Sequence, residues 1–345
     1  METLSATKLL DKLLDGNHLI EEEAKWLMTN CMEGTIAPTQ MAAILGALRL
    51  NRENVEEITA FVKVMREKST KIEASYPIVI DTCGTGGDGF GTFNISTAVA
   101  LLLAAGGYKV AKHGNRSNTS KSGSADVLEA LGVNIMLTPE QVSKCIDQVG
   151  VGFLFAPALH SAMKNVVPIR KELGVRTVFN ILGPLTNPAS ANVQVVGLFQ
   201  PALVPTIIRV LAELGLRSAY VVSGENGLDE VSLDGKTQVA HLDSKGNINE
   251  FLFEAQTYGF AKADIVDIKG GTPEENAEII RKIFSGEIKD AQRDIVILNA
   301  GFALSAADDI SLKEGFEKAK AILDSGTCVS LLDRLATLTQ SFAAA

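Results

Sequence analysis

Two polar loops and one acidic pair hold most of the chemically useful residues of this sequence. The first loop runs from Cys83 to Asn94, directly after the apolar run Ile78–Asp81, and an Ala/Leu-rich stretch follows it. Nine of the chain's 30 glycines fall between Gly84 and Ser124, more than twice an even share. A strand, a glycine-rich turn and a helix that Asn94 caps predict an anion site, because exposed backbone N–H groups and the helix dipole both favour negative charge.

This first loop matches neither standard nucleotide signature. A phosphate-binding P-loop needs Gly-Lys-Ser/Thr after four variable residues, and no such lysine is present. A dinucleotide fingerprint expects an acid about 20 residues further on, where this chain has the basic segment Lys109–His113. The loop therefore indicates an anionic ligand of another kind, or a turn that serves only the fold.

The second loop, Lys112–Ser124, contains three basic side chains, a histidine, hydroxyls and amides, but no acid. The whole segment Gly84–Ser124 has a net charge of +3 within a chain whose net charge is −9. We expect this loop to coordinate several phosphate oxygens, although a polar surface loop has a similar composition. Since both loops follow neighbouring strands of one sheet, they open at the strand C-termini, where open α/β sheets bind ligands.

Three further side chains are candidates for binding. Asp229 and Glu230 follow the apolar run Ala219–Val222, and adjacent carboxylates on a loop could hold Mg²⁺ together with substrate phosphates and water; a solvated acidic turn is the alternative. Arg170 could clamp a carboxylate or form an exposed salt bridge. His160 stands alone nearby, and such a histidine is more often structural.

The elements that must position these residues form two groups. Residues 1–72 have only helical patterns, with Ser5 as a cap, Pro38 opening a helix and a capping box at Asn54 and Glu57.

From Tyr76 onward, short apolar runs alternate with helical stretches, which predicts crossover units and a mostly parallel sheet. We expect an α/β fold: a small N-terminal helical domain (1–72, with a contribution from about 165–190) hinged to a larger α/β domain (73–345) that has a mostly parallel central sheet.

Composition narrows the class of protein. The chain has 345 residues, 46% hydrophobic and 21% charged, with 32 Lys and Arg against 41 Asp and Glu. This balance opposes binding to nucleic acid or to anionic membranes, and no apolar run is long enough to span a bilayer. Cys31, Cys83, Cys145 and Cys328 lack metal-ligand spacing, and the N-terminus lacks a signal-peptide pattern, so we expect a reduced cytoplasmic protein.

These motifs together resemble the anthranilate phosphoribosyltransferases, which act in tryptophan biosynthesis and share a fold class with nucleoside phosphorylases. The resemblance covers nearly the whole chain, and the order and spacing of the motifs all agree. The matching segments are Gly84–Asp88, Asn94–Thr97, Lys112–Arg116, Ser122–Gly132, Arg176–Pro188 and Asp229–Ser232.

The resemblance implies two substrates, anthranilate and phosphoribosyl pyrophosphate (PRPP), Mg²⁺ as two ions per subunit, and a homodimer. It implies a PRPP site at Gly84, Gly87, Asp88, Thr92, Asn94, Ile95, Ser96, Thr97, Lys112, His113, Gly114, Asn115, Arg116, Ser117, Asn118, Thr119, Ser120 and Ser124. It implies anthranilate contacts at Gly84, Asn115 and Arg170, with His113 and His160 alongside, and Mg²⁺ at Ser96, Asp229 and Glu230. It leaves association with an anthranilate synthase open.

Small departures from the family pattern stand at Asn118, Thr119 and Ser161. The first two bear on the loop over the phosphates, and Ser161 on the channel for the aromatic acid. None of them falls at Arg170 or at the metal positions.

The implied chemistry needs no covalent nucleophile, because the aryl amine is neutral at pH 7 and the difficult step is loss of pyrophosphate from ribose C1. Two alternatives remain. A pyrimidine nucleoside phosphorylase resembles this chain in fold, but such enzymes have Lys-His-Ser where this chain has Asp81-Thr82-Cys83. A nucleic-acid-binding relative of the fold is opposed by the net charge of −9.

Overall fold

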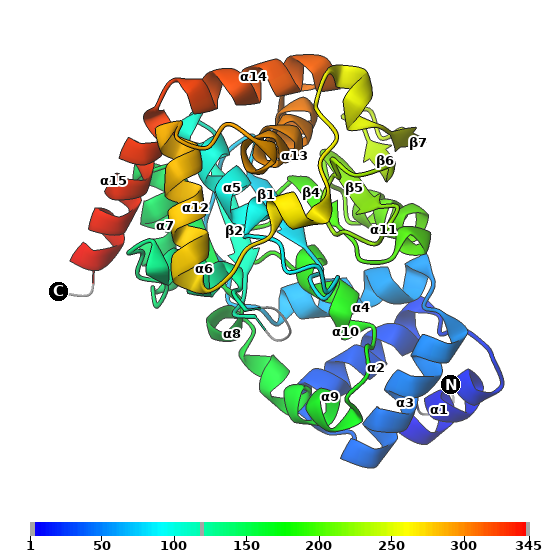
Figure 1. The fold of residues 1–345 in the computed structure, drawn as a ribbon. Helices are drawn as coiled ribbons and strands as arrows, with labels where there is room; N and C mark the ends of the chain where they lie inside the picture. Colours follow the sequence, from blue (N-terminus) through cyan, green and yellow to red (C-terminus); the bar gives the residue numbers. More distant parts are fainter. Residues whose placement is uncertain (1–3, 118–120, 343–345) are drawn as a thin grey trace.

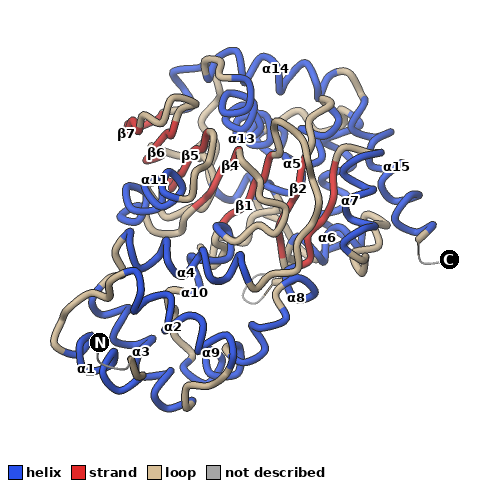
Figure 2. Tube along the Cα trace, turned by 180° about the vertical axis from the view of Figure 1, so that it is seen from behind, coloured by secondary structure: helices blue, strands red, loops and turns tan. Residues whose placement is uncertain are grey.

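A seven-stranded sheet crosses the larger part of the computed structural model, which describes residues 4–117 and 121–342, in the order β3-β2-β1-β4-β5-β6-β7 (Figures 1 and 2). The strands are β1 (Ile80–Gly84), β2 (Val110–Gly114), β3 (Val151–Phe155), β4 (Val193–Gly197), β5 (Ser218–Gly224), β6 (Thr237–Leu242) and β7 (Ile248–Phe253).

The first five strands of the sheet are parallel, with Ile80 of β1 opposite Val110 of β2 and opposite Val193 of β4. The expectation of a mostly parallel sheet is therefore confirmed. The antiparallel pairs β5–β6 and β6–β7 at one edge were not predicted. Strand β7 is exposed along most of its length, and Phe253 at its end is buried.

A bundle of four helices precedes the sheet: α1 (Ala6–Leu14), α2 (Glu21–Glu33), α3 (Pro38–Asn51) and α4 (Val55–Glu67). Ser5 accepts a hydrogen bond from Lys8 N at 3.4 Å, and Asn54 forms a capping box with Glu57. These local signals confirm the predicted helix starts.

Helices cover both faces of the sheet (Figure 1). Helices α5 and α13 contact each other and β1, β4 and β5, whereas α11 contacts β5, β6 and the bundle helix α4. The helices of this part are α5 (Ile95–Ala105), α6 (Ser124–Ala130), α7 (Pro139–Gln148), α11 (Val204–Glu213), α12 (Pro273–Ser285), α13 (Ala291–Asp308), α14 (Leu312–Asp324) and α15 (Thr327–Ser341). Short 3₁₀ turns are η3 (Pro201–Leu203), η4 (Ala255–Tyr258) and η5 (Ile265–Ile268).

The segment between β3 and β4 leaves the sheet and packs on the helical bundle (Figure 2). In it, η1 contacts α2, α9 contacts α3, and α10 contacts α4. Its apolar side chains Val166, Ile169 and Phe179 share a core with Ile58 and Phe61 of α4. The elements of this segment are α8 (Ala156–Leu159), η1 (Ser161–Asn165), α9 (Val167–Leu173), α10 (Phe179–Leu182) and η2 (Gly183–Leu185).

Among the described residues, no single helix is both long and apolar enough to cross a membrane. Helices α13 and α14 pass that test only as a pair, bent by 115°. Most of α13 is buried in the core beside the sheet.

Candidate active site

The loops after β1 and β5 meet at the C-terminal edge of the sheet. Gly86 N donates to Asp229 Oδ2 at 2.6 Å. Two glycines permit this approach, since a Cβ on Gly84 would overlap the Asp229 side chain and one on Gly197 would overlap its backbone. Sequence reasoning found Gly84 but missed Gly197, whose role depends on a residue far along the chain.

Three carboxylates gather where these loops meet, and Asp88 joins the predicted pair. Burial, followed by the charge of Asp88, raises the pKa of Asp229 to about 7. Burial and then Asp229 raise the pKa of Glu230 well above its usual range, while the backbone N–H of Ser96 favours its charged form. Asp88 Oδ2 is buried and has no hydrogen-bond partner in the described structure. The described residues contain no group of three or more His, Cys, Asp and Glu placed to hold a metal by themselves.

Lys112 lies beneath these loops and not at their surface. It belongs to β2, is buried, and donates through Nζ to Thr82 O at 2.7 Å and Ser96 Oγ at 3.2 Å. Burial lowers the pKa of Lys112, whereas Asp81 and Glu230 raise it. The side chain thus supports Ser96 and provides positive charge near Glu230. Its direct contact with a phosphate stays a prediction.

Asn94 precedes α5 as predicted, but its side chain makes no capping bond. Its Oδ1 accepts hydrogen bonds from Ser122 Oγ at 3.1 Å and Asn276 Nδ2 at 2.9 Å, and its Nδ2 donates to Ser122 O at 3.1 Å. The side chain therefore joins the two predicted anion loops. Asn276 is a buried residue of α12 that no local motif marks.

The segment before α12 supports the same loop. Gly270 N donates to Gly91 O at 2.9 Å, and Thr92 forms a bridge with Lys269. A Cβ at Gly270 would crowd the backbone of Phe93. The end of the glycine-rich loop, including Thr92, is thus held by residues about 180 positions away in the sequence.

Carboxylates of α6, the helix that follows the loop after β2, accept several hydrogen bonds from this loop. Arg116 donates from Nη1 to Asp126 at 2.8 Å and to Glu129 at 2.6 Å, and Asn115 is exposed beside it. Ser117 N donates to Asp126 at 3.1 Å. The predicted contacts Asn118, Thr119 and Ser120 lie outside the described residues. Of the remaining predicted residues, Ser124 begins α6, Gly114 ends β2, Ile95 and Thr97 begin α5, and Gly87 lies in the glycine-rich loop.

His160 and His113 are neighbours, with Nε2 atoms 3.2 Å apart. Both rings are buried, and His113 Nδ1 lies 3.2 Å from Gly183 O. Burial, with His160 as the next cause, lowers the pKa of His113 to about 3, and burial followed by Lys71 lowers that of His160 to about 4. Both rings are therefore neutral near pH 7. The fold thus places the lone His160 beside a second predicted residue.

Arg170 lies in α9, with its guanidinium carbon 5.5 Å from the centre of the Phe179 ring. The side chain is half-buried, and burial lowers its pKa. Arg170 and Phe179 thus form a cation–aromatic pair within the segment that packs on the helical bundle.

Asp81 is a residue of the site region that sequence reasoning did not select. It is fully buried in β1 and accepts hydrogen bonds from His113 N at 3.2 Å and Asn187 Nδ2 at 2.8 Å. Burial raises its pKa, and Lys112 lowers it. Asp81 therefore ties the end of β2 to the segment that returns from the helical bundle.

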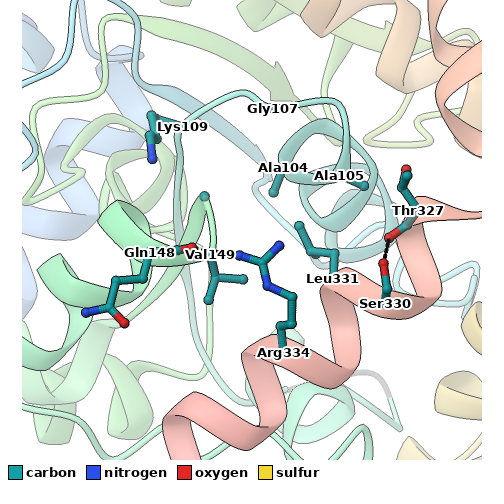
Figure 3. Close-up of a pocket in the computed structure, with 11 residues that line it drawn as sticks. Ala104, Ala105, Gly107, Lys109, Gln148, Val149, Thr327, Ser330, Leu331 and Arg334 are labelled. Carbon is teal, nitrogen blue, oxygen red and sulfur yellow. Dashed lines mark hydrogen bonds between the residues drawn. The ribbon is translucent and has the colours of Figure 1, made fainter.

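A separate hollow of about 280 Å³ lies at the opposite end of the sheet, near the starts of β2 and β3 (Figure 3). Its two cationic side chains donate to carbonyls at the end of α7: Lys109 to Ile146 O at 3.0 Å and Arg334 to Gln148 O at 2.8 Å. These bonds satisfy the last carbonyl groups of α7. The two cationic side chains of this hollow therefore have a structural role.

Comparison with known domain families defines the class of protein. The chain matches the helical bundle domain of a glycosyl transferase family over residues 7–69 and the a/b domain of that family over residues 76–329. The chain thus contains both domains of a glycosyl transferase family.

Whole-chain relatives narrow the class to one family. An anthranilate phosphoribosyltransferase of Pelotomaculum thermopropionicum is 49% identical over 331 residues, which cover 96% of this chain and 95% of the relative. A solved anthranilate phosphoribosyltransferase from Thermus thermophilus has a TM-score of 0.90 and 42% identity, covering 96% of this chain and 99% of that one. The Saccharomyces cerevisiae anthranilate phosphoribosyltransferase, solved in complex with PRPP and Mg, has a TM-score of 0.89 and 28% identity over 97% of this chain and 98% of that one. The chain belongs to the anthranilate phosphoribosyltransferase family.

Proposed function

We propose that this protein transfers the phosphoribosyl group of PRPP to the amine of anthranilate and releases pyrophosphate. The observation that carries the proposal is the meeting of the glycine-rich loop with the half-buried pair Asp229 and Glu230, where Gly86 N donates to Asp229. Backbone N–H donors beside carboxylates suit a polyphosphate that arrives with a divalent cation. The S. cerevisiae relative has been solved with PRPP and Mg, and also with 4-fluoroanthranilate.

The pyrophosphate and phosphate groups of PRPP belong, in this proposal, at the two anion loops. Gly84, Gly87 and Asp88 provide the first turn, and Thr92 with Asn94–Thr97 provides the start of α5. His113–Ser117 and Ser124 provide the second loop, together with the predicted Asn118–Ser120. Lys112 acts from below by orienting Ser96, to which it donates at 3.2 Å.

The residues present fit Mg²⁺, and two ions per subunit are part of this proposal. Asp88 has a buried oxygen without a partner in the described structure, and Asp229 and Glu230 have raised pKa values. Burial and like charge thus disfavour the ionised forms of Asp229 and Glu230, and at Glu230 the charge of Lys112 opposes this only in part. Ser96, Asp229 and Glu230 would hold the metal, and substrate oxygens and water would complete its shell. When bound, Mg²⁺ would neutralise charge that develops on the departing pyrophosphate.

Anthranilate would lie between Arg170 and the histidine pair. The guanidinium of Arg170 would orient the carboxylate, and Gly84 and Asn115 would contact the acid from the sheet side. His113 and His160, both neutral near pH 7, would line the way in without adding charge. Ser161, which follows His160, begins η1 at this entrance.

The protein's groups act by positioning and electrostatics, without a covalent nucleophile. The aryl amine already has its lone pair free. Burial raises the pKa of the Cys83 thiol well above its usual range, so the one cysteine of the site region is not a thiolate near pH 7. The amine would attack ribose C1 opposite the leaving group, with inversion, while the bond from C1 to pyrophosphate breaks; the nitrogen would then release one proton to solvent.

The predicted division at residue 72, with a hinge to the α/β domain, is part of the proposal. One contact marks the crossing: Thr70 N donates to Leu159 O, shortly after β3, at 2.9 Å. Movement there would bring Arg170 toward the loops at the sheet and exclude water from the reacting sugar.

We also propose a homodimer through the helical bundle. Leu14 is 66% exposed and Leu50 82% exposed, and Asn51 Nδ2 donates to Leu13 O at 2.7 Å, which brings these two helix ends together. A second copy would cover these leucines. Sedimentation of the parent and of Leu50→Glu should give a dimer and a monomer; a monomeric parent would contradict this.

The reaction is tested by product analysis. Purified protein, anthranilate, PRPP and Mg²⁺ should give one pyrophosphate for each anthranilate consumed, and a product whose mass equals that of anthranilate plus the phosphoribosyl group minus one hydrogen. Phosphate with thymidine tests the phosphorylase alternative, and a gel shift at physiological salt tests nucleic-acid binding. Thymine release without anthranilate consumption would overturn the proposal.

A further inference from the structure

One exposed arginine connects the helical bundle to the glycine-rich loop. Arg176 follows α9, and its guanidinium donates to the backbone carbonyl of Gly87. The carbonyl of Arg176 itself accepts a hydrogen bond from Arg49 Nη1 of α3 at 2.7 Å. A continuous chain of contacts therefore runs from α3, through Arg176, to the middle of the loop.

An aromatic side chain fixes the direction of this guanidinium. The guanidinium carbon of Arg176 lies 3.9 Å from the centre of the Phe199 ring, directly after β4. Phe199 N donates to Thr85 Oγ1 at 3.2 Å, and Thr85 N donates to Gly197 O at 2.9 Å. The ring on which Arg176 stacks is thus tied to the first residues of the same loop.

We infer that Arg176 is a positioning residue that holds the glycine-rich loop in its PRPP-binding conformation. Several loop glycines, including Gly86 and Gly87, have positive φ values of 67° and 75°, and such a backbone has many accessible conformations when it is not restrained. Engaging the Gly87 carbonyl holds that peptide with its oxygen toward Arg176, so that neighbouring N–H groups stay available for phosphate. The inference rests on the proposed function for its ligand.

Both charge and shape are required of this side chain. A planar guanidinium can stack on Phe199 and donate to Gly87 at once, whereas a lysine ammonium offers the same charge without the stacking plane. The contact also reaches α3 through Arg49, so movement of the bundle would move the loop.

The first test is kinetic. Arg176→Ala should raise the KM for PRPP about tenfold, the range for loss of a charged hydrogen bond, and change the KM for anthranilate less than about twofold. Arg176→Lys should recover less than half of the loss, and Arg49→Ala and Phe199→Leu should give smaller shifts in the same direction. Arg209→Ala removes an exposed arginine of α11 whose partner is Glu250 at 3.8 Å and should match the parent. A lysine variant with the parent's KM would overturn the inference, because charge alone would then suffice.

The second test does not need activity. Hydrogen exchange of the peptide that contains Thr85–Gly91 should be faster in Arg176→Ala than in the parent, with unchanged exchange in β1. Equal exchange rates would overturn the inference, whatever the kinetics. A parent protein that transfers no phosphoribosyl group would contradict the proposed function, while the exchange comparison would still decide whether Arg176 holds the loop.

Discussion

The acidic and the histidine regions of the site respond to the same burial in opposite ways. Around Asp229 and Glu230, burial raises the carboxylate pKa values, and Asp88 adds like charge. Around His113 and His160, burial lowers the imidazole pKa values to about 3 and 4. The first region therefore needs a cation to become fully charged, whereas the second is already stable as a neutral pair. The contrast suits a metal–polyphosphate on one side and an aromatic acid on the other.

Removal of the acidic pair should have the largest effect on activity and tests the acidic region of the site. The double variant Asp229→Asn/Glu230→Gln should lower kcat about 1000-fold, since metal stabilisation of transition-state charge contributes several kcal/mol. Steady-state rates across a Mg²⁺ titration measure the effect. Glu225→Gln is the matched control, because Glu225 is an exposed acid of the same loop. A double variant with the parent's rate at limiting Mg²⁺ would contradict the metal assignment.

Arg170 tests the opposite side of the site. Arg170→Ala should raise the KM for anthranilate between about 10-fold and 100-fold, because it removes a charged hydrogen bond, with kcat retained. Lys171→Ala, at the exposed neighbouring position, should behave as the parent in the same assay. If the KM for PRPP rose instead, Arg170 would belong with the acidic region and the comparison would fail.

Acid sensitivity sharpens the account of the histidine region. The folded pKa values of about 3 and 4 lie below the unfolded value near 6.5, so the unfolded chain binds more protons as the pH falls. Stability from these groups is complete above pH 6.5 and is lost progressively toward pH 4. Each histidine should lower the free energy of unfolding by about 2 kcal/mol between pH 7 and pH 5.

Urea unfolding at several pH values measures this loss. His160→Gln should be less acid-sensitive than the parent over that range. Buried carboxylates such as Asp81, whose pKa is raised, contribute to the pH dependence of stability with the opposite sign. This contribution cancels when the pH dependence of the unfolding free energy is compared between the parent and His160→Gln. Identical slopes in the two proteins would mean that His160 is not buried as a neutral ring.

A smaller effect is expected at Asn276, on the acidic side. Asn276→Asp keeps the shape but replaces the donor to Asn94 Oδ1 by a carboxylate oxygen, which should raise the KM for PRPP about threefold to tenfold by disturbing both anion loops. The KM for anthranilate is the internal control. A change in thermal stability without any change in KM would show that Asn276 acts only in the fold.

Local signals predicted much of the fold. Helix α5 begins at Ile95 and ends at Ala105 as expected, because a glycine pair ends its apolar run. The capping box of Asn54 and Glu57 was likewise predictable, because its two residues are close in the sequence. The strand β7, which is exposed along most of its length, was not predicted.

Site residues that are neighbours in the sequence were predictable. Site residues that come together only in the folded chain were not. The glycine-rich turn and the Asp229–Glu230 pair are local patterns. Asp81, Gly197 and Asn276 were missed because their partners are distant in sequence. Lys112 carried the expected charge, yet strand pairing in β2 turned it into the core; a pattern of charges does not show which face of a strand is covered.

Anthranilate fluorescence tests the central claim most directly. The emission of anthranilate should fall with time when the protein is mixed with PRPP and Mg²⁺, should remain constant if either is omitted, and should stop falling when EDTA is added. Fluorescence that stays constant with both present, in protein shown to be folded, would contradict the proposed transfer.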